Sequence, residues 1–297
     1  MQVREFGGRG RQDGHGDHYT GAVAGGEVRP VGRWVEVADH VWVRRHTELD
    51  LSLGLVAGER ACLVVDTGAD ERQGAEFAAA VRELTGLPWS VVLTHAHFDH
   101  AFGTAAFDGA TVWAHPGCRA ELAGGAQDQR TTWAAYYRAQ GDPEAAARVE
   151  TARIVPPDQL VDAAAEIDLG GRAVRLLHPG PGHTGHDLVA HVPDAGVLFA
   201  GDLVEQGAPP SFDDSHPAAW PAAVDRLLDL GARTVVPGHG EPVDAAFVTR
   251  QRDELAEIAD LCRAVAAGEM TADVALARSP YPAAFTSEAL RRAATSS

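Results

Sequence analysis

Residues 94–100, with the sequence THAHFDH, carry three imidazoles and a carboxylate directly after the apolar run 91–93. Neutral imidazole is the commonest metal ligand among protein side chains, and a nearby carboxylate adds charge and a place to hold a water. A strand that ends in such a turn points several ligand atoms at one place. The sequence therefore predicts a metal site here, rather than a polar loop in which histidines cluster by chance. The candidate ligands in this turn are His95, His97, Asp99 and His100.

Three further candidate ligands, His183, Asp202 and His239, each follow an apolar run and lie beside glycine. They belong to the segments 182–186, 201–202 and 237–240. A rigid strand followed by a glycine-flanked polar residue presents a ligand from the rim of a sheet, because glycine lets the backbone approach closely. Each signal alone is weak. Since all have metal-ligand chemistry, we expect the segments to converge on one metal site.

Taken together, these residues resemble the metallo-β-lactamase superfamily from about Trp34 to the final helices. The segment 64–68 is similar to the first motif of that family, in which the aspartate, here Asp66, supports the site. The resemblance implies an α/β (α+β) fold, namely a four-layer αββα sandwich of two mixed β-sheets with helices on the outer faces. Periodicity alone indicates only a mixture of helix and strand.

The resemblance also implies a pair of metal ions. His95, His97 and His183 match the ligands of the first ion, Asp99, His100 and His239 match those of the second, and Asp202 is placed to bridge both. Thr94 and His186 are expected to support the ligands, with a substrate contact as the alternative for His186. Imidazole and carboxylate without thiolate suit zinc, and iron or manganese also fit these ligand types.

This ligand set predicts a metal-dependent hydrolase with two Zn²⁺ per chain. Bound zinc lowers the pKa of water to about 7, so a metal-bound hydroxide takes the place of a serine or cysteine nucleophile. Asp99 is expected to be the catalytic residue that orients this hydroxide and relays its proton to the leaving group. The predicted reaction is cleavage of an ester, thioester or lactone bond in a small acyl substrate.

The aspartate at position 202 narrows the choice among branches of the family. Thioesterase-like, lactonase-like and phosphodiesterase-like branches use aspartate there, whereas many β-lactamases carry cysteine or serine. A phosphodiesterase and, less favoured, a β-lactam hydrolase stay as alternatives within the fold. A non-catalytic metal-binding protein is the alternative from another class, although a closed structural site commonly has cysteine-rich ligands.

Charge and cysteine content limit the partners. The formal net charge is −17, with 42 acidic against 25 basic residues, so the surface repels a phosphate backbone and no nucleic-acid partner is expected. Cys62, Cys118 and Cys262 are far apart and form no C-x-x-C pair, which favours reduced cysteines and a cytoplasmic protein. No stretch is apolar enough for a membrane span. The oligomeric state is not predicted.

Residues 1–30 are expected to form a flexible N-terminal tail in which His15 and His18 are inert. Residues 31–297 are expected to form the metallo-β-lactamase-fold domain, including C-terminal helices. Strands are predicted at 34–37, 41–43, 51–57, 61–65, 111–114, 173–177, 187–192 and 196–200. Helices are predicted over 77–84 with Gly86 as the C-terminal cap, over 101–107, within 117–150 and over 255–265.

Two segments between the candidate ligands are expected to shape the pocket. Residues 117–150 are predicted to be a helical lid whose Tyr136 and Tyr137 either stabilise an oxyanion or, as we favour, pack the helix onto the sandwich. The loop 205–220 is either a lip over the metals or a solvated acidic loop. His115 and His178 are expected to be structural.

Overall fold

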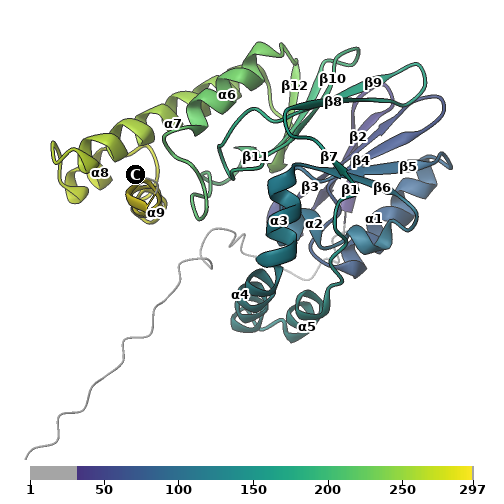
Figure 1. Ribbon diagram of the computed structural model, residues 1–297, viewed down its shortest axis with the longest axis horizontal. Coiled ribbons are helices and arrows are strands. Elements are labelled where there is room, and N and C mark those ends of the chain that lie inside the picture. The colour runs from purple at the N-terminus through teal and green to yellow at the C-terminus, as the bar shows by residue number, and fades with distance from the viewer. Residues whose placement is uncertain (1–31, 296–297) are drawn as a thin grey trace, which may run out of the picture.

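The computed structural model describes residues 32–295. Two β-sheets pack face to face at the centre, and helices cover the outer face of each sheet (Figure 1). This arrangement confirms the predicted four-layer αββα sandwich. The predicted tail, and with it His15 and His18, lies outside the described residues.

The first sheet has the strand order β1-β2-β3-β4-β5-β6-β7. Strands β1 to β4 are antiparallel, and β4 to β7 are parallel. Strands β3 and β4 are buried along their whole length, which explains why they are near-continuous apolar runs. The strands are β1 (Gly32–Ala38), β2 (Val41–His46), β3 (Ser52–Ala57), β4 (Cys62–Val65), β5 (Trp89–Val92), β6 (Thr111–Ala114) and β7 (Gln159–Leu160).

The second sheet has the order β12-β11-β10-β9-β8, in which only the β11–β12 pair is parallel. It contains β8 (Ala164–Asp168), β9 (Ala173–Leu177), β10 (Val189–Val192), β11 (Val197–Glu205) and β12 (Thr234–His239). Apolar side chains from both sheets, such as Val65 and Val92 from the first and Phe199 and Val236 from the second, form the core between them. This core fixes the two sheets against each other.

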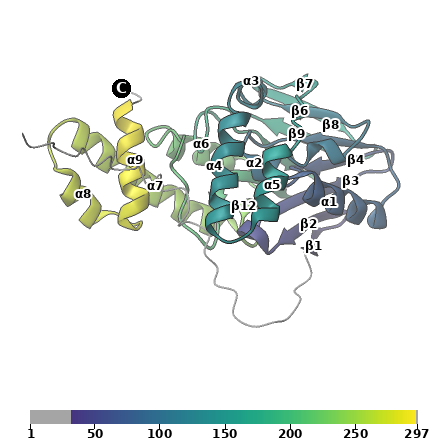
Figure 2. The ribbon, with the colours of Figure 1, turned by 90° about the horizontal axis from the view of Figure 1, so that it is seen from below.

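Helices α1 to α5 pack on the first sheet, α6 and α7 cover the outer face of the second sheet, and α8 and α9 pack on α7 beyond it (Figure 2). Helix α1 begins where the Asp70 carboxylate accepts a hydrogen bond from Gln73 N, and α7 begins in the same way at Asp244. The helices are α1 (Glu71–Leu84), α2 (Phe98–Ala101), α3 (Pro116–Gly124), α4 (Ala126–Ala139), α5 (Pro143–Thr151), α6 (Trp220–Asp229), α7 (Ala245–Ala266), α8 (Ala272–Arg278) and α9 (Ala283–Thr295). Within residues 32–295, no helix is both long and apolar enough to cross a membrane.

Several predicted elements differ from the structure. Helices α1 and α7 begin at Glu71 and Ala245, before the predicted starts at 77 and 255. The helix predicted over 101–107 is instead α2 followed by the 3-10 turn η3 (Thr104–Ala106), because the chain bends where a β-carbon on Gly103 would lie 2.1 Å from the Thr67 carbonyl oxygen. Gly86 is not the cap of α1, since the extended Thr85 ends that helix. Strand β11 runs on to Glu205, five residues beyond the predicted end, and so includes Asp202.

Candidate metal centre

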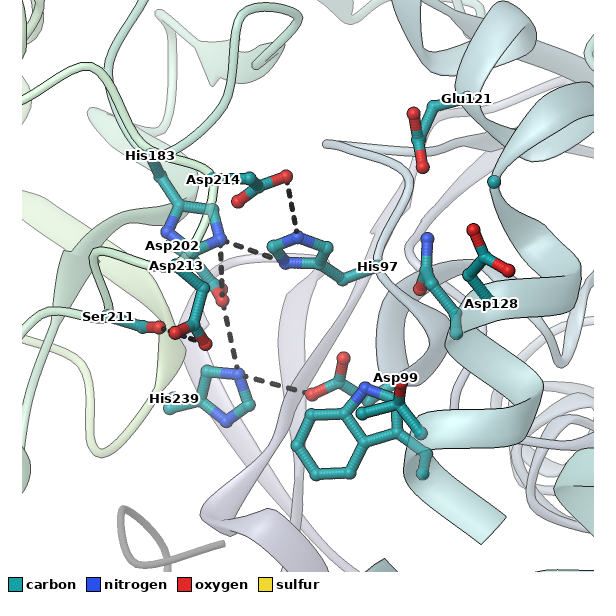
Figure 3. A pocket seen from close by; sticks show the side chains of 14 residues that line it. His97, Asp99, Glu121, Asp128, His183, Asp202, Ser211, Asp213, Asp214 and His239 are labelled. Atoms are coloured by element: carbon teal, nitrogen blue, oxygen red, sulfur yellow. Dashed lines mark hydrogen bonds and ion pairs between the residues drawn. The ribbon is translucent and has the colours of Figure 1, made fainter. Parts of the chain in front are cut away.

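The seven candidate ligands lie on four segments that meet where strands β5, β11 and β12 approach one another. His95 and His97 lie in the loop after β5, Asp99 and His100 in α2, His183 in the loop before β10, Asp202 in β11, and His239 at the end of β12. Figure 3 shows side chains from these segments pointing into a common cavity. The structure thus brings together all the predicted ligands.

Glycine makes this convergence possible at Asp202. A β-carbon on Gly238 would lie 1.8 Å from Asp202 Oδ1, so only glycine at this position leaves room for the carboxylate. Gly201 has a φ of +54° at an irregularity in the β11–β12 ladder, which suits glycine. The predicted role of glycine beside the ligands therefore has a steric basis.

Three imidazoles form the first cluster of ligand atoms. His97 Nδ1 lies 3.0 Å from His95 Nε2 and 3.0 Å from His183 Nε2. With metal–nitrogen bonds of about 2.0–2.1 Å, nitrogens around one tetrahedral zinc ion lie roughly 3.3 Å apart. One proton on His97 Nδ1 would satisfy only one neighbour, whereas a cation between the three nitrogens would satisfy all of them. These residues therefore fit a metal ion.

Asp99, His100 and His239 form the second cluster. His239 Nε2 lies 3.3 Å from Asp99 Oδ2 and 3.3 Å from His100 Nε2. The buried Asp202 carboxylate lies between the two clusters, with its oxygens 3.2–3.7 Å from the Nε2 atoms of four imidazoles, His95, His100, His183 and His239. A carboxylate in this place is positioned to interact with ions in both clusters.

Hydrogen bonds orient the imidazoles from behind. Asp66 accepts bonds from Thr94 N (2.7 Å) and Thr94 Oγ1 (2.8 Å), so the predicted pair Asp66 and Thr94 lies directly beside the clusters. A proton on Nδ1 leaves the Nε2 lone pair for a metal. The Nδ1 contacts are His95 to Thr94 Oγ1 (3.0 Å), His100 to Asp66 Oδ2 (2.8 Å) and His239 to the Leu49 carbonyl oxygen (2.7 Å).

Burial and neighbouring charges shift the pKa values of the candidate ligands in opposite directions. Burial lowers the pKa of His183 to about 4. Burial also opposes the charged form of His239, but Asp202 and Asp99 outweigh it and raise the pKa of His239 to about 9. Burial would raise the pKa of Asp202, whereas the nearby imidazoles of His100 and His239 hold it well below its usual range. Metal ligands must be deprotonated, so metal binding at this centre displaces protons.

The other predicted histidines, His186, His115 and His178, are not among the described residues that line the cavity. His186 is buried and donates its backbone N–H to Thr184 Oγ1 (3.1 Å). The rings of His115 and His178 lie 4.4 Å apart, and His178 Nδ1 donates to the Asp187 carbonyl oxygen (2.8 Å). The contacts of His115 and His178 are consistent with the structural role expected for them, whereas the role expected for His186 stays a prediction.

Two carboxylates beside the site were not assigned a role from the sequence. Asp187 accepts bonds from Thr184 N (2.9 Å) and Thr184 Oγ1 (2.7 Å), and so fixes the turn that carries His183. The T-x-x-D spacing of that turn could have indicated it. Asp214 Oδ2 lies 3.3 Å from His97 Nε2. No spacing rule connects these two residues, which are 117 positions apart.

A cavity of about 260 Å³ opens beside the clusters (Figure 3). One wall is formed by α3 and α4, which contribute Glu121, Asp128 and the indole of Trp133, and the loop 206–219 faces it with Asp213 and Asp214. The predicted lid and lip therefore both contribute to the cavity wall. The lid is three helices, interrupted at residue 125 and at 140–142.

Neither candidate tyrosine is among the described residues of the cavity wall. Tyr137 is buried and donates its hydroxyl to Glu48 Oε1 (2.8 Å). Tyr136 packs with its ring centroid 5.3 Å from that of Trp133. Both tyrosines therefore make packing contacts, as the interpretation favoured in the sequence analysis expects.

Comparison with known proteins decides the family. A family model described as the metallo-beta-lactamase superfamily matches residues 46–239, the segment that contains all seven candidate ligands. The chain belongs to the metallo-β-lactamase superfamily. Members of this superfamily typically bind metal ions, and both the predicted family and the prediction of a metal-dependent hydrolase are confirmed.

Relatives within the superfamily cover most of the chain. Acyl-coenzyme A thioesterase MBLAC2 of Homo sapiens is 28% identical over 245 residues, which are 76% of this chain and 86% of that protein. A metallo-beta-lactamase type 2 of Bacillus cereus is 25% identical over 231 residues, 73% of this chain and 79% of that one. The metallo-beta-lactamase structure from Pontibacter korlensis superposes with a TM-score of 0.58 at 21% identity, over 76% of this chain and 99% of that chain. That superposition supports the fold.

Proposed function

We propose that this metallo-hydrolase holds two zinc ions and hydrolyses thioesters of small acyl groups, with esters and lactones as related substrates. The observation that carries the proposal is that the first cluster, which contains His97, and the second cluster, which contains His239, both lie against the Asp202 carboxylate, next to an open cavity. The thioesterase among the relatives supports a thioester over the other acyl substrates. The ligands for the first ion would be His95, His97 and His183, and for the second Asp99, His100 and His239, with Asp202 between them.

Asp99 is placed to carry the proton of the reaction. When bound, the metal pair supplies a nucleophile from water at neutral pH and polarises the substrate carbonyl. Asp99 lines the cavity, where its carboxylate can accept the proton of the attacking water and pass it to the leaving group. A thiol leaves easily because its ordinary pKa is about 8.5. One carboxylate held beside His239 is therefore sufficient for a thioester.

The cavity offers an apolar surface for the acyl group. Trp133 lines the wall and stacks on Phe98, with ring centroids 4.2 Å apart and an angle of 27° between the planes. This stacking holds the indole in one orientation. A small acyl chain lying against it would place its carbonyl toward the Asp99 side of the cavity.

The charge of the cavity limits the other half of the substrate. Two divalent cations would neutralise four of the six carboxylates in its wall, and no arginine is among the described wall residues. The chain also contains no lysine. The remaining negative potential repels phosphate groups. We therefore propose thioesters whose thiol part is neutral or cationic, and phosphodiesters are disfavoured for the same reason. The six wall carboxylates are Asp99, Glu121, Asp128, Asp202, Asp213 and Asp214.

A substrate panel tests this proposal. The zinc-loaded protein is assayed with thioesters of N-acetylcysteamine and of coenzyme A, an aryl ester, a lactone, a phosphodiester and a β-lactam. We expect the highest kcat/KM for the neutral thioester, its loss in Asp99→Asn, and no change in Asp39→Asn, whose carboxylate is exposed in the β1–β2 turn. Faster turnover of the phosphodiester or β-lactam, or no turnover of any acyl substrate, would contradict the proposal.

A further inference from the structure

The C-terminal helix α9 reaches back to the metal centre through one arginine. Arg292 donates from Nη2 to the Asp214 carbonyl oxygen (2.9 Å) and from Nε to the Ser215 carbonyl oxygen (3.3 Å). Helix α9, yellow in Figure 1, lies outside the residues 46–239 that the family model matches. Arg292 therefore connects a part of the chain beyond that segment to a loop at the cavity.

Asp214 in this loop contacts the far side of a candidate ligand. Its Oδ2 lies 3.3 Å from His97 Nε2, and the opposite ring nitrogen, Nδ1, faces the nitrogens of His95 and His183. A carboxylate on one nitrogen of an imidazole keeps the proton there, leaves the lone pair on the other nitrogen, and fixes the ring orientation. His97 is the candidate ligand that offers Nδ1, so it needs its own partner at Nε2.

The loop depends on anchors because the Asp214 side chain is 43% exposed. Phe212 is buried against Trp220 and Tyr281, with ring centroids 5.5 and 6.2 Å apart, and Tyr281 lies between α8 and α9. His216 N donates to the Gly182 carbonyl oxygen (2.8 Å), next to His183. Between these two anchors, Arg292 holds the backbone at residues 214–215. Without it, the partly exposed Asp214 side chain can turn away from His97.

We propose that Asp214 is a positioning residue for the first metal ion and that Arg292 holds it against His97, so that α9 sets the affinity of this ion. The inference rests on the proposed ligation by His97. Loss of such a partner typically weakens metal binding about 10- to 100-fold. Because Arg292 acts through Asp214, its removal should cause a smaller loss, and none once Asp214 has been replaced.

The role of Asp214 and Arg292 is tested by measuring zinc affinity in competition with a chromophoric chelator. The absorption spectrum of the cobalt-substituted protein reports the coordination geometry. We expect weaker binding of one ion in Asp214→Asn, a smaller loss in Arg292→Met, partial recovery in Asp214→Glu, and no further loss in the double variant. Arg291→Met is the matched control, since Arg291 is exposed and pairs with Glu288 within α9. Asp213→Asn removes the same charge from the same loop and should change the affinity far less.

Two results would overturn the inference: unchanged zinc affinity in Asp214→Asn, or losses in Asp214→Asn and Arg292→Met that add in the double variant. Circular dichroism of the metal-free variants checks folding, and Arg292→Met alone still tests the connection if Asp214→Asn does not fold. A wild-type protein that binds no metal would instead contradict the proposed function.

Discussion

Replacing Gly238 by alanine tests whether the Asp202 carboxylate must lie where the structure places it. The added β-carbon would lie 1.8 Å from Asp202 Oδ1 and 3.0 Å from Asp202 Cγ. Unstrained carbon–oxygen contacts are about 3.3 Å or longer, so the carboxylate must retreat by roughly 1.5 Å. Metal sites tolerate deviations of only about 0.2 Å in ligand distance. The φ of Gly238 lies outside the left-handed region, so backbone strain is not the cause.

We expect Gly238→Ala to retain less zinc after gel filtration and to lose about 100-fold or more in thioester turnover, even with zinc in excess. Both zinc per chain and kcat are measured. Gly86→Ala is the control, because no atom lies within 4 Å of its added β-carbon. If Gly238→Ala keeps both its zinc content and its rate while the control behaves as wild type, the assigned role of Asp202 is refuted.

Three further predictions follow from the same structure. Asp99→Asn should lower kcat about 100- to 10,000-fold, measured on a neutral thioester, because the proton carrier is lost; an unchanged kcat contradicts that role. Glu121→Gln combined with Asp128→Asn should lower KM for coenzyme A thioesters and leave KM for neutral ones unchanged, and equal changes for both would rule out charge selection. Burial raises the pKa of Asp187 to about 7, although the hydrogen bonds from Thr184 act to lower it. The folded protein then holds more protons than the unfolded chain between about pH 4 and 7, so the free energy of unfolding falls as pH rises through this window. Urea titrations of the metal-free protein should show this decrease in wild type and a weaker one in Asp187→Asn. Identical pH profiles of the two proteins would exclude this contribution of Asp187.

The fold and the meeting of the ligands could be predicted because the signals are local. The candidate ligands lie in the loop after a strand, in a short helix or, as for Asp202 and His239, within or at the end of a strand, and glycine marks the points of close approach, as at Gly201 and Gly238. The bend at Gly103 could not be predicted, since it depends on contact with Thr67, which is distant in sequence. Local periodicity carries no information on such tertiary packing.

The residues around the ligands were harder to predict for the same reason. Asp214 lies in an irregular loop, and its contact with His97 depends on how that loop packs under α9. The role of Tyr137 could be assigned only once its hydrogen-bond partner Glu48, 89 positions away, was known. The ligands could thus be predicted from the sequence, whereas the side chains that orient them could be assigned only from the contacts in the folded structure.

Titration of the metal-free protein with zinc, with thioester hydrolysis recorded at each addition, decides whether two zinc ions per chain drive the reaction. We expect negligible hydrolysis without metal and a rise in rate that ends at two zinc ions per chain. Hydrolysis that persists without metal, or a protein that binds no zinc, would contradict it.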